Sequence, residues 1–306
     1  MVVFVSVIAL CKPSLQRIIL MGDLTRSWSF LHAREVRHFR VPAMAMVSSP
    51  RTVTPLRPAI SSVTTAMPRC RECRLRQFGF FDSMTDAELE FMQRFKNAHG
   101  RSWSGEYLLE QGSQKPRLLT LYSGWAIKTI TLPSGESHLI KVLLPGDLIG
   151  LESVLSGAVR HAVQAVTDVT YCSLDCRQID DMLNIPSLAR RLTVMLLAEQ
   201  QRIAERLAVV GACNARRNFA HFTLDLHQRL RERQMARDEG FRVPLTSVQL
   251  ADALGLTTVH LNRVLRSFRQ DGILTLENHV LTIQDMSALR EVAALSGPSS
   301  ESCPLL

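Results

Sequence analysis

The 306-residue sequence contains no run of about 18 apolar residues, so no segment is expected to span a membrane. Its seven cysteines are irregularly spaced and do not make a disulfide framework for a chain of this length, which points to a reducing compartment. The chain also lacks a glycine-rich phosphate loop, an HExxH pair and a GxSxG turn, and its nine histidines are scattered. These absences predict a cytoplasmic protein that is not an enzyme.

Positive charge is what the sequence has in excess. Lysine and arginine number 36 against 28 aspartate and glutamate residues, which gives a net charge of +8. That balance favours a polyanionic partner, although part of the excess lies near the N-terminus. Residues 33–68 mix Arg, Pro, Ser and Thr without periodicity. We expect a disordered extension over residues 1–66 and a tail over residues 291–306, with room for two domains between them.

A series of short strands is predicted between Trp103 and Leu174. Stretches rich in β-branched and large apolar residues alternate here with turn signals. The turn signals are Ser123-Gly124, Pro133–Gly135 and Pro145–Asp147. Many short strands at this spacing are typical of a small sandwich or a barrel-like β-roll, which we assign to residues 67–176.

A long helix is predicted to follow, over residues 177–213. Apolar residues recur at spacings of three, four and seven after Pro186, and no helix breaker interrupts them. These residues are Leu188, Leu192, Leu196, Ile203, Leu207 and Val210. Because a monomer would leave such a stripe partly uncovered, we expect the helix to pair with its own copy about a two-fold axis. The alternative is that the stripe packs on the β-roll.

Residues 244–274 have the pattern of a helix-turn-helix unit, within a domain of residues 214–290. The first helix begins with a capping box from Thr246 to Gln249. It ends at Gly255, where a left-handed backbone costs little. A predicted β-hairpin after the second helix would complete a winged helix.

The second helix combines a narrow apolar stripe with a basic opposite face. Leu261, Val264, Leu265 and Phe268 fall on one side of a helical wheel, and no acidic residue interrupts the helix before Asp271. The pattern is typical of a DNA-binding helix, and the alternative is an ordinary helical hairpin with a solvated basic face. The candidate DNA-binding residues are Thr246, Ser247, Thr257, Thr258, Val259, His260, Asn262, Arg263 and Arg266.

Taken in order, these motifs resemble those of the Crp/Fnr family of bacterial transcription regulators, and the resemblance covers residues 70–288. The matching stretches are Ser123–Lys128, Leu132–Glu136, Leu144–Gly150, Leu245-Thr246, Gly255–Thr257, Arg263–Leu265 and Asp271–Leu274. The resemblance implies an α+β fold with an N-terminal cyclic-nucleotide-binding-like β-roll, a long dimerisation helix and a C-terminal winged helix-turn-helix. It also implies a homodimer on a palindromic operator in double-stranded DNA, with each recognition helix in a major groove and RNA polymerase as a partner.

Individual positions of the recognition helix refine this expectation. Arg263 matches the arginine with which the family contacts a base, and an arginine fork meets O6 and N7 of guanine together. Val259 stands where a glutamate is common, and Asn262 where serine or glycine is common, so we expect an operator that differs from the family consensus at one base. Arg266 is a candidate for a phosphate contact. The alternative function is a β-roll protein that acts through protein partners and binds DNA without sequence preference.

The resemblance also suggests where an effector would bind. Cyclic-nucleotide members hold their ligand with a glutamate directly after the glycine of the PGD-x-x-G stretch and with a later Arg-Ser/Thr-Ala. Here Leu151 follows Gly150, and the carboxylate of Glu152 is displaced by one position. The candidate effector residues are Gly150, Glu152, Arg160 and His161, and cAMP is not expected to bind.

Oxygen-sensing members of the family hold a [4Fe–4S] cluster with four cysteines. Cys70 and Cys73 match the first pair, and Cys172 falls where the distant ligand is found. The third N-terminal cysteine is absent, because Gly79 or Phe81 occupies its place. The sequence leaves open an incomplete iron–sulfur cluster, a zinc ion, a thiol switch and no cofactor at all.

Overall fold

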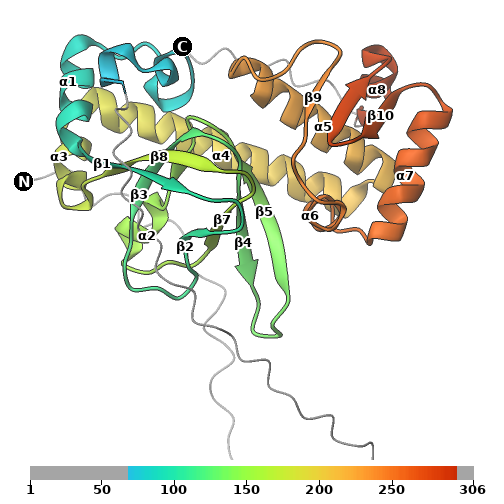
Figure 1. The fold of residues 1–306 in the computed structure, drawn as a ribbon, viewed down its shortest axis with the longest axis horizontal. Helices are drawn as coiled ribbons and strands as arrows, with labels where there is room; N and C mark the ends of the chain where they lie inside the picture. The colour runs from blue at the N-terminus through green and yellow to red at the C-terminus, as the bar shows by residue number, and fades with distance from the viewer. Residues whose placement is uncertain (1–67, 295–306) are drawn as a thin grey trace, which may run out of the picture. The chain divides into compact units, whose positions relative to one another are not determined.

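The computed structural model describes residues 68–294 (Figure 1). The expected extension over residues 1–66 therefore lies outside the described residues, as does most of the expected tail. The described chain begins with three short 3-10 helices and then α1, whose start at Thr85 has the capping box that the sequence predicts. These elements are η1 (Cys70–Glu72), η2 (Arg74–Gln77), η3 (Gly79–Phe81) and α1 (Asp86–Phe95).

Two four-stranded antiparallel sheets follow and form the predicted β-roll. The first sheet has the order β1 (Lys96–Ser102), β8 (Val169–Leu174), β3 (Leu118–Ser123), β6 (Leu148–Ile149). The second has the order β2 (Tyr107–Leu109), β7 (Ala162–Ala165), β4 (Ala126–Thr131), β5 (Ser137–Leu143). Leu119, Leu121, Ala126, Val163 and Val169 lie in one buried cluster to which both sheets contribute, so the roll has its own core.

Two elements of this region were not predicted. Strand β1 has the polar sequence Lys-Asn-Ala-His-Gly-Arg-Ser, of which only Ser102 is buried. It pairs with β8 along a sheet edge, where Gly100 leaves room for the ring of Tyr171, because a Cβ at Gly100 would lie 2.3 Å from that ring. The short helix α2 (Leu151–Ser156) starts directly after Gly150, whose φ of +85° requires glycine.

The long helix is shorter at its start than the predicted 177–213. Residues Cys176–Gln178 form η4, Ile179–Leu183 form α3, and α4 spans Pro186–Ala212. The break has a local cause, since proline occupies the first turn of α4 and holds the preceding residue in an extended conformation. No described helix is long and apolar enough to cross a bilayer.

Only the first part of the apolar stripe on α4 is covered. Leu188 and Leu192 are buried in a cluster with residues of α1 and the β-roll. The remaining residues of the stripe lie exposed in the single chain, and Leu207 is the most exposed at 73%. The stripe therefore packs on the β-roll at one end and has no partner among residues 68–294 at the other.

The C-terminal region is the predicted winged helix-turn-helix. Its elements are α5 (Ala215–Glu232), β9 (Gly240–Arg242), α6 (Ser247–Ala253), α7 (Thr258–Gln270), β10 (Leu274–Glu277), β11 (Val280–Ile283) and α8 (Met286–Ala293). The strands form one sheet in the order β10-β11-β9. Helix α8 reaches Ala293, three residues beyond the predicted end of this domain at residue 290.

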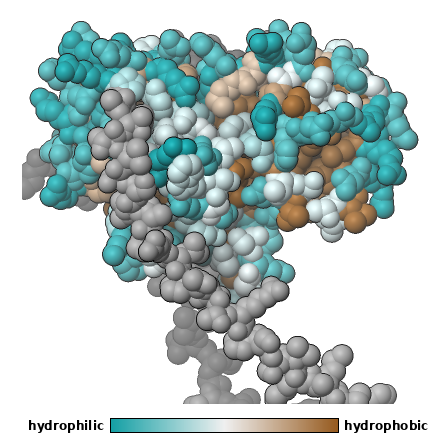
Figure 2. Space-filling view, in the orientation of Figure 1, coloured by the Kyte–Doolittle hydropathy of each residue, from teal (hydrophilic) through white to brown (hydrophobic). Residues whose placement is uncertain are grey.

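One buried cluster joins this region to the β-roll. Phe219 and Leu226 of α5 share it with Leu139 and Val142 of β5, and all described residues belong to one compact unit. Hydrophobic residues nevertheless remain visible on the half of the surface where Figure 1 draws α5 to α8 (Figure 2).

Candidate nucleic-acid interface and regulatory sites

The two helices of the helix-turn-helix are fixed at their starts by side-chain caps. Thr246 Oγ1 accepts a hydrogen bond from the Gln249 amide at 3.1 Å, and Gln249 Oε1 accepts one from the Thr246 amide at 2.9 Å. Gly255 in the turn has a φ of +65°. Thr257 Oγ1 accepts a hydrogen bond from the His260 amide at 3.2 Å and so caps α7. Both threonines predicted to bind DNA at these positions therefore also set the helix starts.

Helix α7 buries the face that the helical wheel predicts. Leu261, Val264 and Phe268 are buried, and the Phe268 ring lies 5.6 Å from that of Phe219 on α5. The candidate DNA-binding residues are exposed on the other side or at the helix starts, apart from Thr258, which is half-buried. Those exposed residues are Thr246, Ser247, Thr257, Val259, His260, Asn262, Arg263 and Arg266.

The far end of α7 is held by a residue that the sequence analysis did not single out. Arg216 of α5 pairs with Asp271 at 2.5 Å, hydrogen-bonds Ser267 Oγ, and places its guanidinium 4.6 Å from the centre of the Phe268 ring. Because Arg216 lies far from α7 in sequence, no local pattern predicts this contact. It holds the C-terminal end of α7 against α5.

A cavity of about 850 Å³ between the β-roll and α4 contains most of the candidate effector residues. Gly150, Glu152 and His161 line it, whereas Arg160 is exposed and does not. The Glu152 carboxylate pairs with Lys128 of β4, and His161 Nδ1 lies 3.5 Å from Glu152 Oε1. His161 and Lys128 outweigh the effect of burial and lower the pKa of Glu152 to about 2. The carboxylate is therefore ionised and already paired within the chain.

The three candidate cysteines come together in a second, much smaller cavity. Cys70, Cys73 and Cys172 line a space of about 30 Å³ together with Phe81 and Lys96. Burial raises the pKa of Cys70 and of Cys73, and raises that of Cys172 to about 12. All three thiols are thus protonated near neutral pH. We call this group the cysteine pocket.

A histidine also reaches the cysteine pocket. His99 of β1 places its Nδ1 3.7 Å from Cys172 Sγ, and burial lowers the pKa of His99, so its imidazole is neutral at pH 7. Within residues 68–294, however, no three His, Cys, Asp or Glu side chains are arranged to hold a metal ion. The sequence analysis missed His99 because β1 was not predicted.

Comparison with known proteins places this geometry in a family. The model of a cyclic nucleotide-binding domain matches residues 103–185, and that of a Crp-like helix-turn-helix domain matches residues 201–292. The chain is 27% identical over 241 residues to the transcriptional activator protein FnrL of Cereibacter sphaeroides, covering 76% of this chain and 95% of that protein. The chain belongs to the Crp/Fnr family of transcription regulators.

Other Crp/Fnr proteins are similar over most of their length. The fumarate and nitrate reduction regulatory protein of Escherichia coli is 24% identical over 226 residues, which are 73% of this chain and 90% of that protein. The structure of FixK2 from Bradyrhizobium japonicum has a TM-score of 0.59 and 21% identity, covering 65% of this chain and 98% of that chain. The two domains and their order are thus those of a Crp/Fnr transcription regulator.

The cysteine pocket does not fit the four-cysteine cluster that the Crp/Fnr resemblance implies. Three thiols line it, and Phe81, which stands at or near the place of the further N-terminal cysteine, contributes an apolar side chain to the lining. The donor set and its surroundings therefore disagree with a [4Fe–4S] ligand set.

Proposed function

We propose that this Crp/Fnr protein acts in the cytoplasm as a homodimer that binds a palindromic DNA operator and regulates transcription through RNA polymerase. One observation carries the proposal. The outer face of α7 is exposed, and the guanidinium groups of Arg263 and Arg266 make no hydrogen bond or ion pair with other described residues, so both remain available to a partner. A basic, capped helix presented in this way matches a major-groove reader.

The exposed part of α4 supports the dimer. Leu196, Ile203, Leu207 and Val210 follow one another at spacings of seven, four and three residues, and each is at least 46% exposed. These spacings place them on one helical stripe. Pairing of two such stripes about a two-fold axis would cover them and present two recognition helices to two half-sites.

Selection from random DNA tests both the function and its specificity. We expect the wild-type protein to enrich a palindrome that has guanine at the base that Arg263 contacts in each half-site. At the base that a glutamate would read in other members, the sequence should depart from the family consensus, because Val259 offers no acceptor to cytosine. Recovery of the unmodified consensus half-site would contradict the role given to Val259. Recovery of no sequence at all would favour the alternative in which the β-roll acts through protein partners.

We do not propose cAMP as the effector. The position after Gly150 is an apolar leucine, and the nearby Glu152 carboxylate is already paired with Lys128 and His161. A ribose would have to displace those partners to gain its hydrogen bonds, and the lost ion pairs would oppose binding. The proposal therefore assigns regulation to the amount of protein or to another signal.

For the cysteine pocket we expect protein purified without oxygen to be colourless and to lack stoichiometric iron and sulfide. The reason is the three-thiol donor set, which leaves a cluster one ligand short. An absorbance spectrum with iron and sulfide analysis measures this directly, and Phe81→Cys, which supplies the missing thiol, is the matched variant. Four irons per chain in the wild-type protein, with operator binding lost in air, would overturn this expectation.

A further inference from the structure

Helix α5 is attached to the β-roll by a buried group of charges. Arg229 lies in the last turn of α5, Arg233 directly follows the helix as its C-cap, and Asp147 lies in the turn between β5 and β6. The three side chains are 7%, 8% and 11% exposed. Arg233 Nη2 lies 2.8 Å from Asp147 Oδ1, and Arg229 Nη2 lies 3.2 Å from Asp147 Oδ2. We call Asp147, Arg229 and Arg233 the α5 clamp.

Backbone groups of the β-roll complete the hydrogen bonding of the clamp. Arg229 Nη2 donates to the Val142 carbonyl at 2.7 Å, and Arg233 Nε donates to the Pro145 carbonyl at 2.8 Å. The Leu144 amide donates to Asp147 Oδ2 at 3.0 Å. Burial alone would raise the pKa of Asp147, but Lys141 and the two arginines lower it to about 2. The clamp is therefore ionised at neutral pH and fully paired, as a buried ion group must be to persist.

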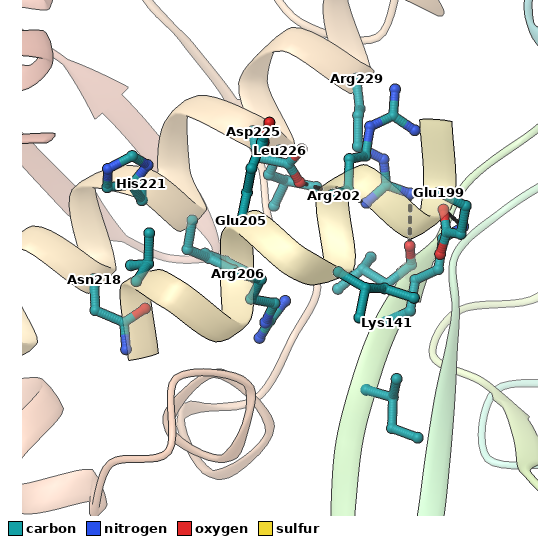
Figure 3. A pocket seen from close by; sticks show the side chains of 15 residues that line it. Lys141, Glu199, Arg202, Glu205, Arg206, Asn218, His221, Asp225, Leu226 and Arg229 are labelled. Carbon is teal, nitrogen blue, oxygen red and sulfur yellow. Dashed lines mark hydrogen bonds and ion pairs between the residues drawn. The ribbon is translucent and has the colours of Figure 1, made fainter. Parts of the chain in front are cut away.

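A cavity of about 110 Å³ lies beside the clamp. Arg229 of α5, Lys141 of β5, and Glu199 and Arg202 of α4 all line it (Figure 3). Lys141 Nζ donates to Glu199 Oε2 at 2.6 Å, so a further ion pair ties β5 to α4 at this point. Three elements that belong to the roll, the long helix and the DNA-binding domain thus meet here through charged side chains.

The segment after Cys70 and Cys73 contacts the α5 clamp and the turn that carries Asp147. The Arg233 guanidinium lies 5.9 Å from the centre of the Phe78 ring, and Gln234 Nε2 donates to Gln77 Oε1 at 3.1 Å. A Cβ at Gly146 would lie 2.9 Å from the Phe78 ring, so that ring is in close contact with the clamp's turn. The clamp is enclosed on this side by residues only a few positions from the cysteine pocket.

Fixing α5 also fixes the recognition helix. Phe219 of α5 packs on Phe268 of α7, and Arg216 of α5 holds Ser267 and Asp271 at the other end of α7. Two recognition helices in a dimer can reach both half-sites only when their separation matches the spacing of the operator. Mobility of α5 on the roll would let that separation vary, and binding would then cost the entropy of ordering it.

We propose that Asp147, Arg229 and Arg233 are positioning residues for operator recognition, which hold the helix-turn-helix at one place on the β-roll and so set the half-site spacing that the dimer accepts. The inference rests on the proposed function, because it concerns how the dimer reads its operator. None of the three residues contacts DNA in this role. Their effect is on which spacing binds and not on which base is read.

The test compares clamp variants with wild-type protein on operators whose spacer is correct, shortened by one base pair or lengthened by one. Asp147→Asn removes one charge of the clamp at nearly constant shape, and Arg233→Gln removes one charge together with the end of the arginine side chain. Arg233→Lys is a milder second variant, since it keeps the charge and loses the fork that reaches Pro145. Arg231→Gln is the matched control, because Arg231 lies on α5, is exposed and, among the described residues, forms its one ion pair with Asp238.

We expect the clamp variants to lose about tenfold in preference for the correct spacing, through weaker binding of the correct operator. Their binding to random-sequence DNA and its salt dependence should match those of the Arg231→Gln control. Melting curves and hydrogen exchange of the β-roll show whether each variant is folded. If Asp147→Asn does not fold, the spacing preference of Arg233→Lys tests the proposal.

Two results would overturn the proposal. One is a folded clamp variant that retains the full spacing preference of the wild-type protein. The other is an equal loss in Arg231→Gln, which would assign the effect to the charge of α5 and not to the clamp. Wild-type protein without any sequence preference would instead contradict the proposed function itself, so the two failures are distinguishable.

Discussion

A protein carrying Leu207→Glu is expected to be a monomer and to bind its operator about 100-fold more weakly or worse than the wild-type protein, because linked binding of two half-sites is lost. Leu207 is 73% exposed in the single chain and lies in the middle of the uncovered stripe of α4. A two-fold axis places two copies of each substitution at the interface, so two carboxylates would have to be buried without partners.

The physical basis is the apolar area that the stripe leaves in water. Fully burying a large aliphatic side chain contributes about 1.5–3 kcal/mol. The four residues of the stripe are 46–73% exposed, so each of them would gain part of this energy when the dimer forms. The Leu207→Glu substitution removes the contribution of the leucine side chain and adds the cost of desolvating a carboxylate within that surface. The fold of one chain should be unaffected, since Leu207 is exposed and outside each of its buried clusters.

Sedimentation equilibrium gives the state of association, and titration of a fluorescent operator at fixed salt gives the affinity. Leu155→Glu is the control, because Leu155 is 55% exposed on α2 and lies outside the stripe. The control should remain a dimer with wild-type affinity. A dimeric Leu207→Glu protein would show that α4 is not the interface.

Local patterns account for the parts of the fold that were predicted correctly. The capping box at Thr246 and the left-handed Gly255 bound α6 as expected, since each depends on residues within a few positions of one another. The stripe from Leu261 to Phe268 is buried because helical periodicity alone decides which side packs. The winged helix-turn-helix could therefore be predicted from residues 244–274 and the hairpin that follows them.

The two errors have different causes, a partner strand distant in sequence for β1 and a local proline for the long helix. Strand β1 is polar throughout and is a strand only because β8 pairs with it. The long helix begins at Pro186, because the proline interrupts a pattern that the apolar spacing alone would continue.

The candidate regulatory sites show the same division. Three cysteines that lie up to 102 positions apart do share one pocket, as the family resemblance implies, but the residues around them determine what they can bind. Lys128 and Asp147 lie in stretches that match the family, but their ion pairs have no local signature, since each pair joins elements distant in sequence. Arg160, which the motif suggested, lies outside the cavity that contains Gly150, Glu152 and His161.

Replacement of Arg263 by alanine is expected to weaken operator binding by about 1–3 kcal/mol, or roughly 5- to 160-fold, and to relax specificity at one base pair of each half-site. The guanidinium of Arg263 is exposed on α7 and has no partner among the described side chains, so its removal leaves the fold intact. Its loss leaves guanine O6 and N7 without their donors, and the penalty falls only on the base that it reads.

Arg266→Ala is the matched comparison, since it removes the same side chain three residues further along the same helix. If Arg266 contacts a phosphate, Arg266→Ala should lose a similar amount of affinity on every DNA sequence. The slope of log affinity against log salt concentration should also become shallower by about one. Measuring both variants against operators with each of the four bases at the Arg263 position separates the two roles. Equal discrimination among those bases by Arg263→Ala and by wild-type protein would remove the base contact from Arg263, and a change of base preference in Arg266→Ala would move it one turn along the helix. Comparison of the two variants thus tests whether α7 recognises the base sequence of DNA or binds only its phosphate charge.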